Sequence, residues 1–98
     1  MILAGRVMGW FVYMIEASDG SLYTGVTTDV ERRFAEHGDS DKGAKFFRGR
    51  KPVKIVYQQD HPDRSSALKR EAEIEKLTRE NKLLLIGKSG SKPPGRPC

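Results

Sequence analysis

The stretch "WFVYMIEASDGSLYTGVT", residues 10–27, decides the fold, because it holds two strand-like segments joined by a turn signal. Residues Trp10 to Ala17 form a nearly continuous run of apolar, β-branched and aromatic residues, which is typical of a central strand covered on both faces. Asp19-Gly20 is a strong two-residue hairpin signal, because both turn positions need a positive φ. The residues after it are again strand-like, so we expect an antiparallel hairpin.

The next segments predict a helix and a third strand. Thr28, with Glu31 three residues later, is a capping-box pattern, and Gly38 is placed to end a helix of about ten residues that begins there. The chain that follows is too rich in glycine and charge to predict a regular element. The segment "VKIVYQQ", residues 53–59, then predicts a third strand.

Two further helices are predicted in the C-terminal half. Asp63 or Ser65 can cap a helix that runs through "SALKREAEIEKL", residues 66–77. Thr78 can cap a short third helix over "RENKLLLI", residues 79–86. Both segments therefore follow the third strand.

Together the segments predict one α/β (α+β) domain, a small three-stranded sheet flanked by helices in the order β-β-α-β-α-α. The relative direction of the second and third strands stays open. We expect the domain to span residues 10–86, after an N-terminal extension (1–9). Gly87 should end the last helix and begin a disordered basic tail (87–98), because that segment cannot bury apolar surface.

Composition limits the classes of function. With 98 residues, 37% of them hydrophobic, the chain can build one modest core. A net charge of +5 and a pI near 9.6 favour a polyanionic partner, either nucleic acid or an anionic membrane surface. No apolar run approaches the roughly 18 residues that span a bilayer, so we expect a cytoplasmic protein. The single cysteine, Cys98, excludes a disulfide framework and a cysteine-based zinc site.

The first predicted helix places charged side chains beside its apolar stripe. Four residues follow the i, i+3, i+4, i+7 pattern of one face: Val30, Arg33, Phe34 and His37. Arg32 falls instead on the solvent side, where it should form a solvated ion pair with Glu36 four residues later. A guanidinium beside the core needs a carboxylate, a phosphate or several carbonyls to offset its desolvation. Alternatively, Arg33 extends to the edge of the core and His37 is a cation near the helix C-terminus.

The second predicted helix shows the same feature with the opposite charge. Glu71 lies between the apolar residues Ala67 and Ile74, and Glu75, one turn later, is also near the apolar arc. One reading is a structural ion pair between such a glutamate and Arg33. The other is a metal ligand, because one carboxylate with waters and phosphate oxygens commonly holds Mg²⁺.

Two tyrosines and one basic loop complete the candidate residues. The hairpin could bring the hydroxyls of Tyr13 and Tyr23 to one end of the sheet, although strand tyrosines usually only pack. In the loop "KGAKFFRGRK", residues 42–51, cations could contact phosphates and aromatic rings could stack on bases; alternatively, both phenylalanines are fixed in the core. The candidate nucleic-acid-binding residues are Lys42, Lys45, Phe46, Phe47, Arg48, Arg50 and Lys51.

These motifs resemble the GIY-YIG nuclease superfamily, most closely its small stand-alone bacterial members. That group is related to the nuclease domains of the excision-repair incision protein and of intron-homing endonucleases. The resemblance extends from Trp10 to Ile86 and rests on "FVY" at 11–13, "YTG" at 23–25, "DVERRFAEH" at 29–37 and "SALKRE" at 66–71. Phe11 replaces the opening glycine of the signature, and Val12 and Thr24 replace its isoleucines.

The resemblance implies a set of catalytic residues and a metal. The signature tyrosines correspond to Tyr13 and Tyr23, the catalytic arginine to Arg33, the following histidine to His37 and the metal-binding glutamate to Glu71. In the family scheme a signature tyrosine, here Tyr13, takes a proton from the attacking water, and His37 is the competing candidate.

The resemblance also implies an activity and a partner. The implied activity is hydrolysis of DNA phosphodiesters with Mg²⁺ or Mn²⁺, structure-directed or nonspecific, in repair or recombination; RNA is not excluded as a substrate. The alternative is a nucleic-acid-binding module of the same fold that does not cut, or that cuts only with a partner protein.

Overall fold

The computed structural model of the chain describes residues 9–39 and 42–88. Most of the N-terminal extension, and the predicted tail from residue 89 to Cys98, lie outside these ranges. Among the helices within these ranges, none is both long enough and apolar enough to cross a bilayer.

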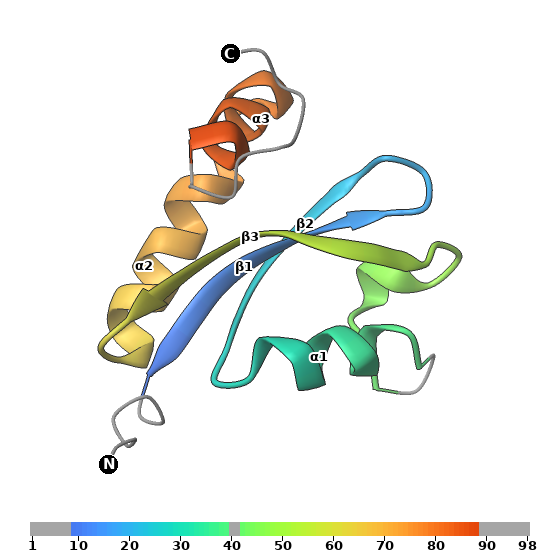
Figure 1. The fold of residues 1–98 in the computed structure, drawn as a ribbon, viewed down its shortest axis with the longest axis horizontal. Coiled ribbons are helices and arrows are strands. Elements are labelled where there is room, and N and C mark those ends of the chain that lie inside the picture. Colours follow the sequence, from blue (N-terminus) through green and yellow to red (C-terminus); the bar gives the residue numbers. More distant parts are fainter. Residues whose placement is uncertain (1–8, 40–41, 89–98) are drawn as a thin grey trace.

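The sheet has three strands, and the predicted first strand is its centre (Figure 1). β1 is Trp10–Ala17, β2 is Leu22–Thr27 and β3 is Pro52–His61, in the spatial order β2-β1-β3. Because β1 pairs antiparallel with both neighbours, β2 and β3 run in the same direction. The chain between β2 and β3 therefore crosses over the sheet.

The turn between β1 and β2 has a three-residue loop, so the prediction of a two-residue loop is wrong. Ala17 N–H donates to Ser21 O and Gly20 N–H donates to Ala17 O, each at 2.9 Å, which adds Ser18 to the loop. Gly20 supplies a positive φ of 87°. The Asp19 carboxylate accepts a hydrogen bond from Ser21 N–H at 3.0 Å and closes the turn.

The crossover helix α1, Val30–His37, begins one residue later than the capping-box pattern predicts. Its N-cap is Asp29, whose side chain accepts the backbone N–H of the third helical residue at 3.0 Å, so the prediction of Thr28 is wrong. The Thr27 hydroxyl accepts from Asp29 N–H at 3.2 Å and holds the cap residue in place. Gly38 ends the helix as predicted.

Both C-terminal helices form in the predicted segments. α2, Arg64–Glu75, has Asp63 as its N-cap, which is one of the two predicted candidates. α3, Arg79–Lys88, begins after Thr78, whose hydroxyl accepts a backbone N–H of its first turn at 3.1 Å. The helix continues through Gly87, so the prediction that this glycine ends it is wrong.

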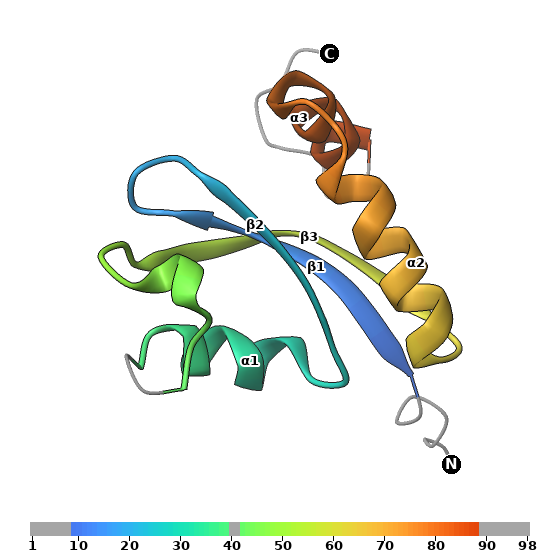
Figure 2. The same ribbon diagram turned by 180° about the vertical axis from the view of Figure 1, so that it is seen from behind.

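Each face of the sheet carries its own core, because successive residues of β1 point to opposite faces. Figures 1 and 2 show α1 and α2 on opposite sides of the twisted sheet. The α2 side buries Val12, Met14, Tyr57, Ala67 and Ile74. The α1 side buries Tyr13, Ile15, Ala17, Val30 and Phe47. On this second side a short 3-10 helix, η2 (Lys45–Phe47), lies in the loop for which no regular element was predicted.

Candidate active site

The strand register brings the two candidate tyrosines together on the α1 side of the sheet. Tyr13 pairs with Gly25 and Ile15 pairs with Tyr23, so the tyrosines are diagonal neighbours with ring centroids 6.2 Å apart. A Cβ atom at Gly25 would lie 2.6 Å from the Tyr13 hydroxyl oxygen and 3.0 Å from the Tyr23 ring. Only glycine therefore leaves room for both rings, which explains the last position of "YTG".

His37, the last residue of α1, is buried among aromatic rings with 2% of its surface exposed. Its ring lies 4.6 Å from the Phe47 ring and 5.0 Å from the Tyr23 ring, between centroids. His37 Nε2 is 3.0 Å from the Tyr13 hydroxyl oxygen. Burial, and then the charge of Arg33, lowers the pKa of His37 to about 4. The imidazole is therefore neutral at pH 7, which contradicts the alternative of a cation at the helix terminus.

Arg33 lies one turn before His37 and is half-buried at the edge of the same core. Its Nη1 donates to the Glu36 carboxylate and to the carbonyl oxygen of Lys42, each at 2.9 Å. The predicted ion pair between Arg32 and Glu36 is present at 3.7 Å, but Glu36 is closer to Arg33. Nη1 makes both bonds, and a further side-chain hydrogen bond links the guanidinium to Tyr13.

Both tyrosines are neutral phenols at physiological pH. Burial raises the pKa of Tyr13, which is 1% exposed, and the charge of Arg33 opposes this rise without cancelling it. Burial also raises the pKa of the half-buried Tyr23, and Arg33 again opposes the rise. Neither phenol can act as a base until a further cation favours its ionised form.

Glu71 extends from α2 between the buried residues Ala67 and Ile74, and it is half-buried. Burial, and then the neighbouring charge of Glu75, raises the pKa of Glu71. Within residues 9–39 and 42–88, its carboxylate makes no hydrogen bond or ion pair, so the structural pairing with Arg33 is contradicted. The charge of Glu71 contributes to the raised pKa of Tyr23, so the carboxylate is within electrostatic reach of the tyrosine pair.

The donor set fits a divalent metal that is held mainly by substrate and water. Among the described residues there is no group of three or more histidine, cysteine, aspartate or glutamate side chains that could hold a metal ion. Mg²⁺, however, is commonly bound through one or two carboxylates, with waters and phosphate oxygens as its other ligands. An unpaired, half-buried carboxylate such as Glu71 suits that mode of binding.

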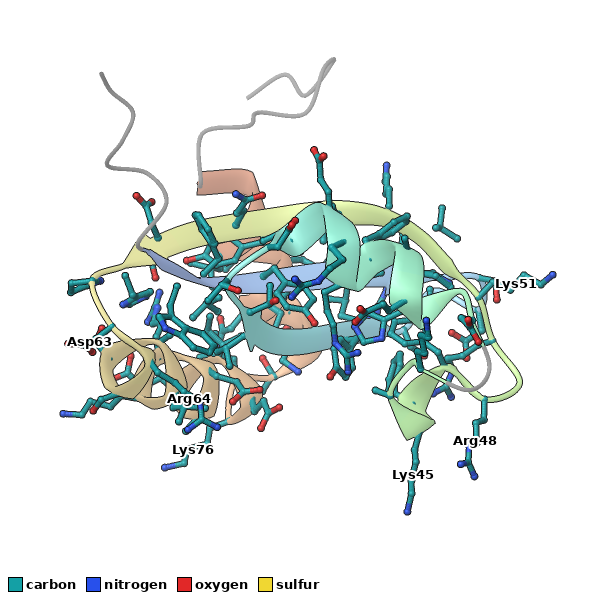
Figure 3. All side chains as sticks on the ribbon, turned by 90° about the horizontal axis from the view of Figure 1, so that it is seen from below. Lys45, Arg48, Lys51, Asp63, Arg64 and Lys76 are labelled. Atoms are coloured by element: carbon teal, nitrogen blue, oxygen red, sulfur yellow. The ribbon has the colours of Figure 1, made fainter. Side chains whose placement is uncertain are left out.

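The basic loop divides into an anchored part and a solvent-facing part. Phe47 is 7% exposed, and both it and Phe46 have ring centroids 5.2 Å from that of Tyr23, so the core-packing alternative is confirmed for Phe47. The Arg50 guanidinium lies 4.3 Å from the centre of the half-buried Phe46 ring and donates to Asp19 at 3.0 Å. Figure 3 shows three other cations projecting away from the molecule at this end: Lys45, Arg48 and Lys51.

An open pocket of about 530 Å³ lies at the same end of the molecule. Ser18 of the hairpin turn, His37 at the end of α1, and Phe47, Arg50 and Lys51 of the loop are among the residues that line it. The lining combines apolar and cationic groups next to the candidate active site. A nucleic acid is a partner with matching chemistry.

Four groups that sequence reasoning missed hold the site in place. They are Gly25, the backbone carbonyl of Lys42, Gly43 and the backbone N–H of Ala44. Gly25 could have been found from the sequence, because it is the glycine of the "YTG" motif that resembles the family's "YIG". No local pattern marks the other three, because they act through a contact between the loop and the end of α1.

A family model described as the GIY-YIG catalytic domain matches residues 9–84. The chain belongs to the GIY-YIG family. It is 48% identical over 77 residues to the UPF0213 protein of Desulfotalea psychrophila, covering 79% of this chain and 70% of that protein. It is 56% identical over 72 residues to the UPF0213 protein of Haloquadratum walsbyi, covering 74% and 80%.

A solved structure of a similar protein has the same fold. The solution NMR structure of the UPF0213 protein from Bacillus halodurans is 44% identical to this GIY-YIG chain, with a TM-score of 0.54. The similarity covers 86% of this chain and 89% of that one. Membership of the GIY-YIG family suggests nucleic-acid binding and a nuclease activity.

Proposed function

We propose that this GIY-YIG protein is a metal-dependent endonuclease that hydrolyses phosphodiester bonds in DNA, in a structure-directed or nonspecific manner. One observation carries the proposal. Tyr13, Tyr23, Arg33 and His37 converge on one side of the sheet, and the carboxylate of Glu71, which has no partner among the described residues, lies within electrostatic reach of Tyr23. A packing role alone would not require an arginine and an unpaired glutamate beside two neutral phenols.

The roles follow from what each group can do where it lies. The guanidinium N–H groups of Arg33 that make no hydrogen bond within the protein would bind the scissile phosphate and offset its developing charge. Tyr23, the more exposed phenol, would orient the phosphate or the attacking water. Glu71 would hold Mg²⁺ or Mn²⁺, which when bound offsets charge on the leaving 3′ oxygen.

Tyr13 would first lose its hydroxyl proton to solvent water, and its phenolate would then take the proton of the attacking water, directly or through a second water. Its raised pKa means that this transfer depends on cations that assemble only with the substrate. Arg33 is already beside Tyr13 and lowers its pKa against the effect of burial. His37 is the second candidate for the proton acceptor.

Plasmid nicking with a matched pair of variants tests the proposal. We expect the wild-type protein to nick supercoiled plasmid, or to cut branched oligonucleotides, only with Mg²⁺ or Mn²⁺. Glu71→Ala should lower the rate by at least about 100-fold, because it removes the metal carboxylate. Glu73→Ala, which removes an exposed carboxylate of the same helix, should keep the wild-type rate.

A binding module without turnover is the second candidate, and the raised pKa of both tyrosines favours it. It predicts DNA binding that weakens with salt and has equal strength in wild type and Glu71→Ala, with no cleavage by either. That outcome would contradict the endonuclease proposal. Equal nicking by wild type and Glu71→Ala would also contradict it.

A further inference from the structure

One short segment of the basic loop contacts the two side chains that α1 contributes to the site, those of Arg33 and His37. The carbonyl oxygen of Lys42 accepts from Arg33 Nη1 at 2.9 Å. The backbone N–H of Ala44 donates to His37 Nδ1 at 3.3 Å. Backbone atoms of Lys42 and Ala44 therefore bind Arg33 and His37.

Gly43 allows this segment to lie directly against the end of α1. A Cβ atom at this position would fall 2.8 Å from His37 Cα and 3.0 Å from His37 O. These are backbone atoms of a helix, so they cannot rotate away as the end of a flexible side chain would. Gly43 is thus required for space, and its neighbours are held at hydrogen-bond distance from Arg33 and His37.

The contact with Ala44 determines which nitrogen of His37 carries the proton. A backbone N–H can only donate, so Nδ1 must be the accepting, unprotonated nitrogen. The low pKa of His37 keeps the ring neutral near pH 7, and a neutral imidazole has one N–H. That proton is therefore on Nε2, which lies 3.0 Å from the Tyr13 hydroxyl oxygen.

We propose that residues Lys42 to Ala44 form a clamp that fixes His37 as a hydrogen-bond donor to Tyr13. The second part of the inference rests on the endonuclease proposed above: His37 is a positioning residue, and Tyr13 is the group that takes the proton from the attacking water. Both ring nitrogens of His37 are occupied, one as acceptor from Ala44 and one as donor to Tyr13. A hydrogen bond donated to the phenol oxygen stabilises the phenolate, which is the form of Tyr13 that can accept a proton from the attacking water.

NMR spectroscopy tests the clamp without any need for activity. In the ¹⁵N-labelled wild-type protein at pH 7, we expect the long-range ¹H–¹⁵N pattern of a ring protonated at Nε2 for His37, with His61 as an internal comparison. A His37 ring protonated at Nδ1, or at both nitrogens, would overturn the clamp. This measurement decides the matter even if every variant fails to fold.

Two substitutions at Ala44 separate the N–H from the side chain. Ala44 has a φ of −70°, which proline adopts, so Ala44→Pro removes the donor without demanding a new φ. We expect Ala44→Pro to lose the single Nε2–H form and Ala44→Ser, which keeps the N–H, to retain it. An unchanged His37 spectrum in Ala44→Pro would count against the clamp.

Two substitutions at His37 test its role in the reaction. Glutamine can place an N–H near the position of Nε2 but cannot accept the proton, whereas alanine can do neither. If His37 only positions Tyr13, His37→Gln should nick plasmid at least about tenfold faster than His37→Ala. Equal loss in both variants would overturn the positioning role. A wild-type protein that never nicks DNA would refute the endonuclease instead, and the NMR result would still judge the clamp.

Discussion

At the scale of single residues, the site is organised around the Tyr13 hydroxyl. His37 Nε2 lies 3.0 Å from it, and the missing side chain of Gly25 gives it space. Arg33 lowers its pKa against the effect of burial, while the backbone of Ala44 fixes the imidazole that faces it. The properties of this one phenol are therefore set by residues from three other segments of the chain, namely β2, α1 and the basic loop.

The buried imidazole also makes the stability of the fold depend on pH. The pKa of His37 is lowered to about 4, below the value near 6.5 that applies in the unfolded chain. Between these values the unfolded chain binds a proton that the folded chain does not. The free energy of unfolding should therefore fall as the pH drops from about 6.5 to about 4, by at most about 3 kcal/mol from this group.

Urea denaturation at a series of pH values between 4 and 7 measures this effect. We expect His37→Gln to have a smaller pH dependence than wild type, because the titrating group is gone. A His37→Gln protein with the full wild-type slope would contradict the assignment.

At the scale of elements, the orientation of α1 about its own axis decides which of its side chains enter the site. Its N-cap is Asp29, and the helix that begins there turns Arg33 and His37 toward the sheet while Arg32 stays exposed. A cap one residue earlier would not change which residues share a face, since the 3.6-residue period fixes that. The cap does determine the stability of the first turn of the helix.

A substitution that removes the N-cap hydrogen bond should lower the free energy of unfolding, whereas a substitution of the neighbouring residue should not. Asp29→Ala deletes the hydrogen bond to Arg32 N–H and should lower the free energy of unfolding by about 1 kcal/mol. Thr28→Ala, at the exposed residue before it, should change it by less than about 0.5 kcal/mol. Thermal denaturation of the two variants measures the difference. A larger loss of unfolding free energy for Thr28→Ala than for Asp29→Ala would contradict the Asp29 cap and support the capping box predicted from the sequence.

Periodicity and local signals account for what could be predicted from the sequence. The inward face of Arg33 and His37, the central position of β1 and the Asp63 cap follow from patterns within one segment. The length of the hairpin loop and the contact of Lys42 and Ala44 with α1 do not, because each depends on how distant segments pack. The protonation of His37 depends on that contact and was therefore beyond sequence reasoning.

At the scale of the whole molecule, exposed cations lie at the same end as the candidate active site, an arrangement that suits a polyanionic partner. Figure 3 shows Lys45, Arg48 and Lys51 at the η2 end of the protein, and Arg64 of α2 and Lys76, the C-cap residue of this helix, at the other end. The open pocket lies at the η2 end and has His37 in its lining. A nucleic acid held by the cations of this end would pass close to the residues proposed for catalysis.

The most direct test of the account compares two adjacent arginines in metal-dependent plasmid nicking. Arg33 lies in the proposed site, whereas Arg32 has the same charge on the solvent side of the same helix. We predict that Arg33→Ala lowers the nicking rate by about 100-fold or more and that Arg32→Ala stays within a few-fold of wild type. Equal rates for the two variants, or a greater loss for Arg32→Ala, would contradict the proposed active site.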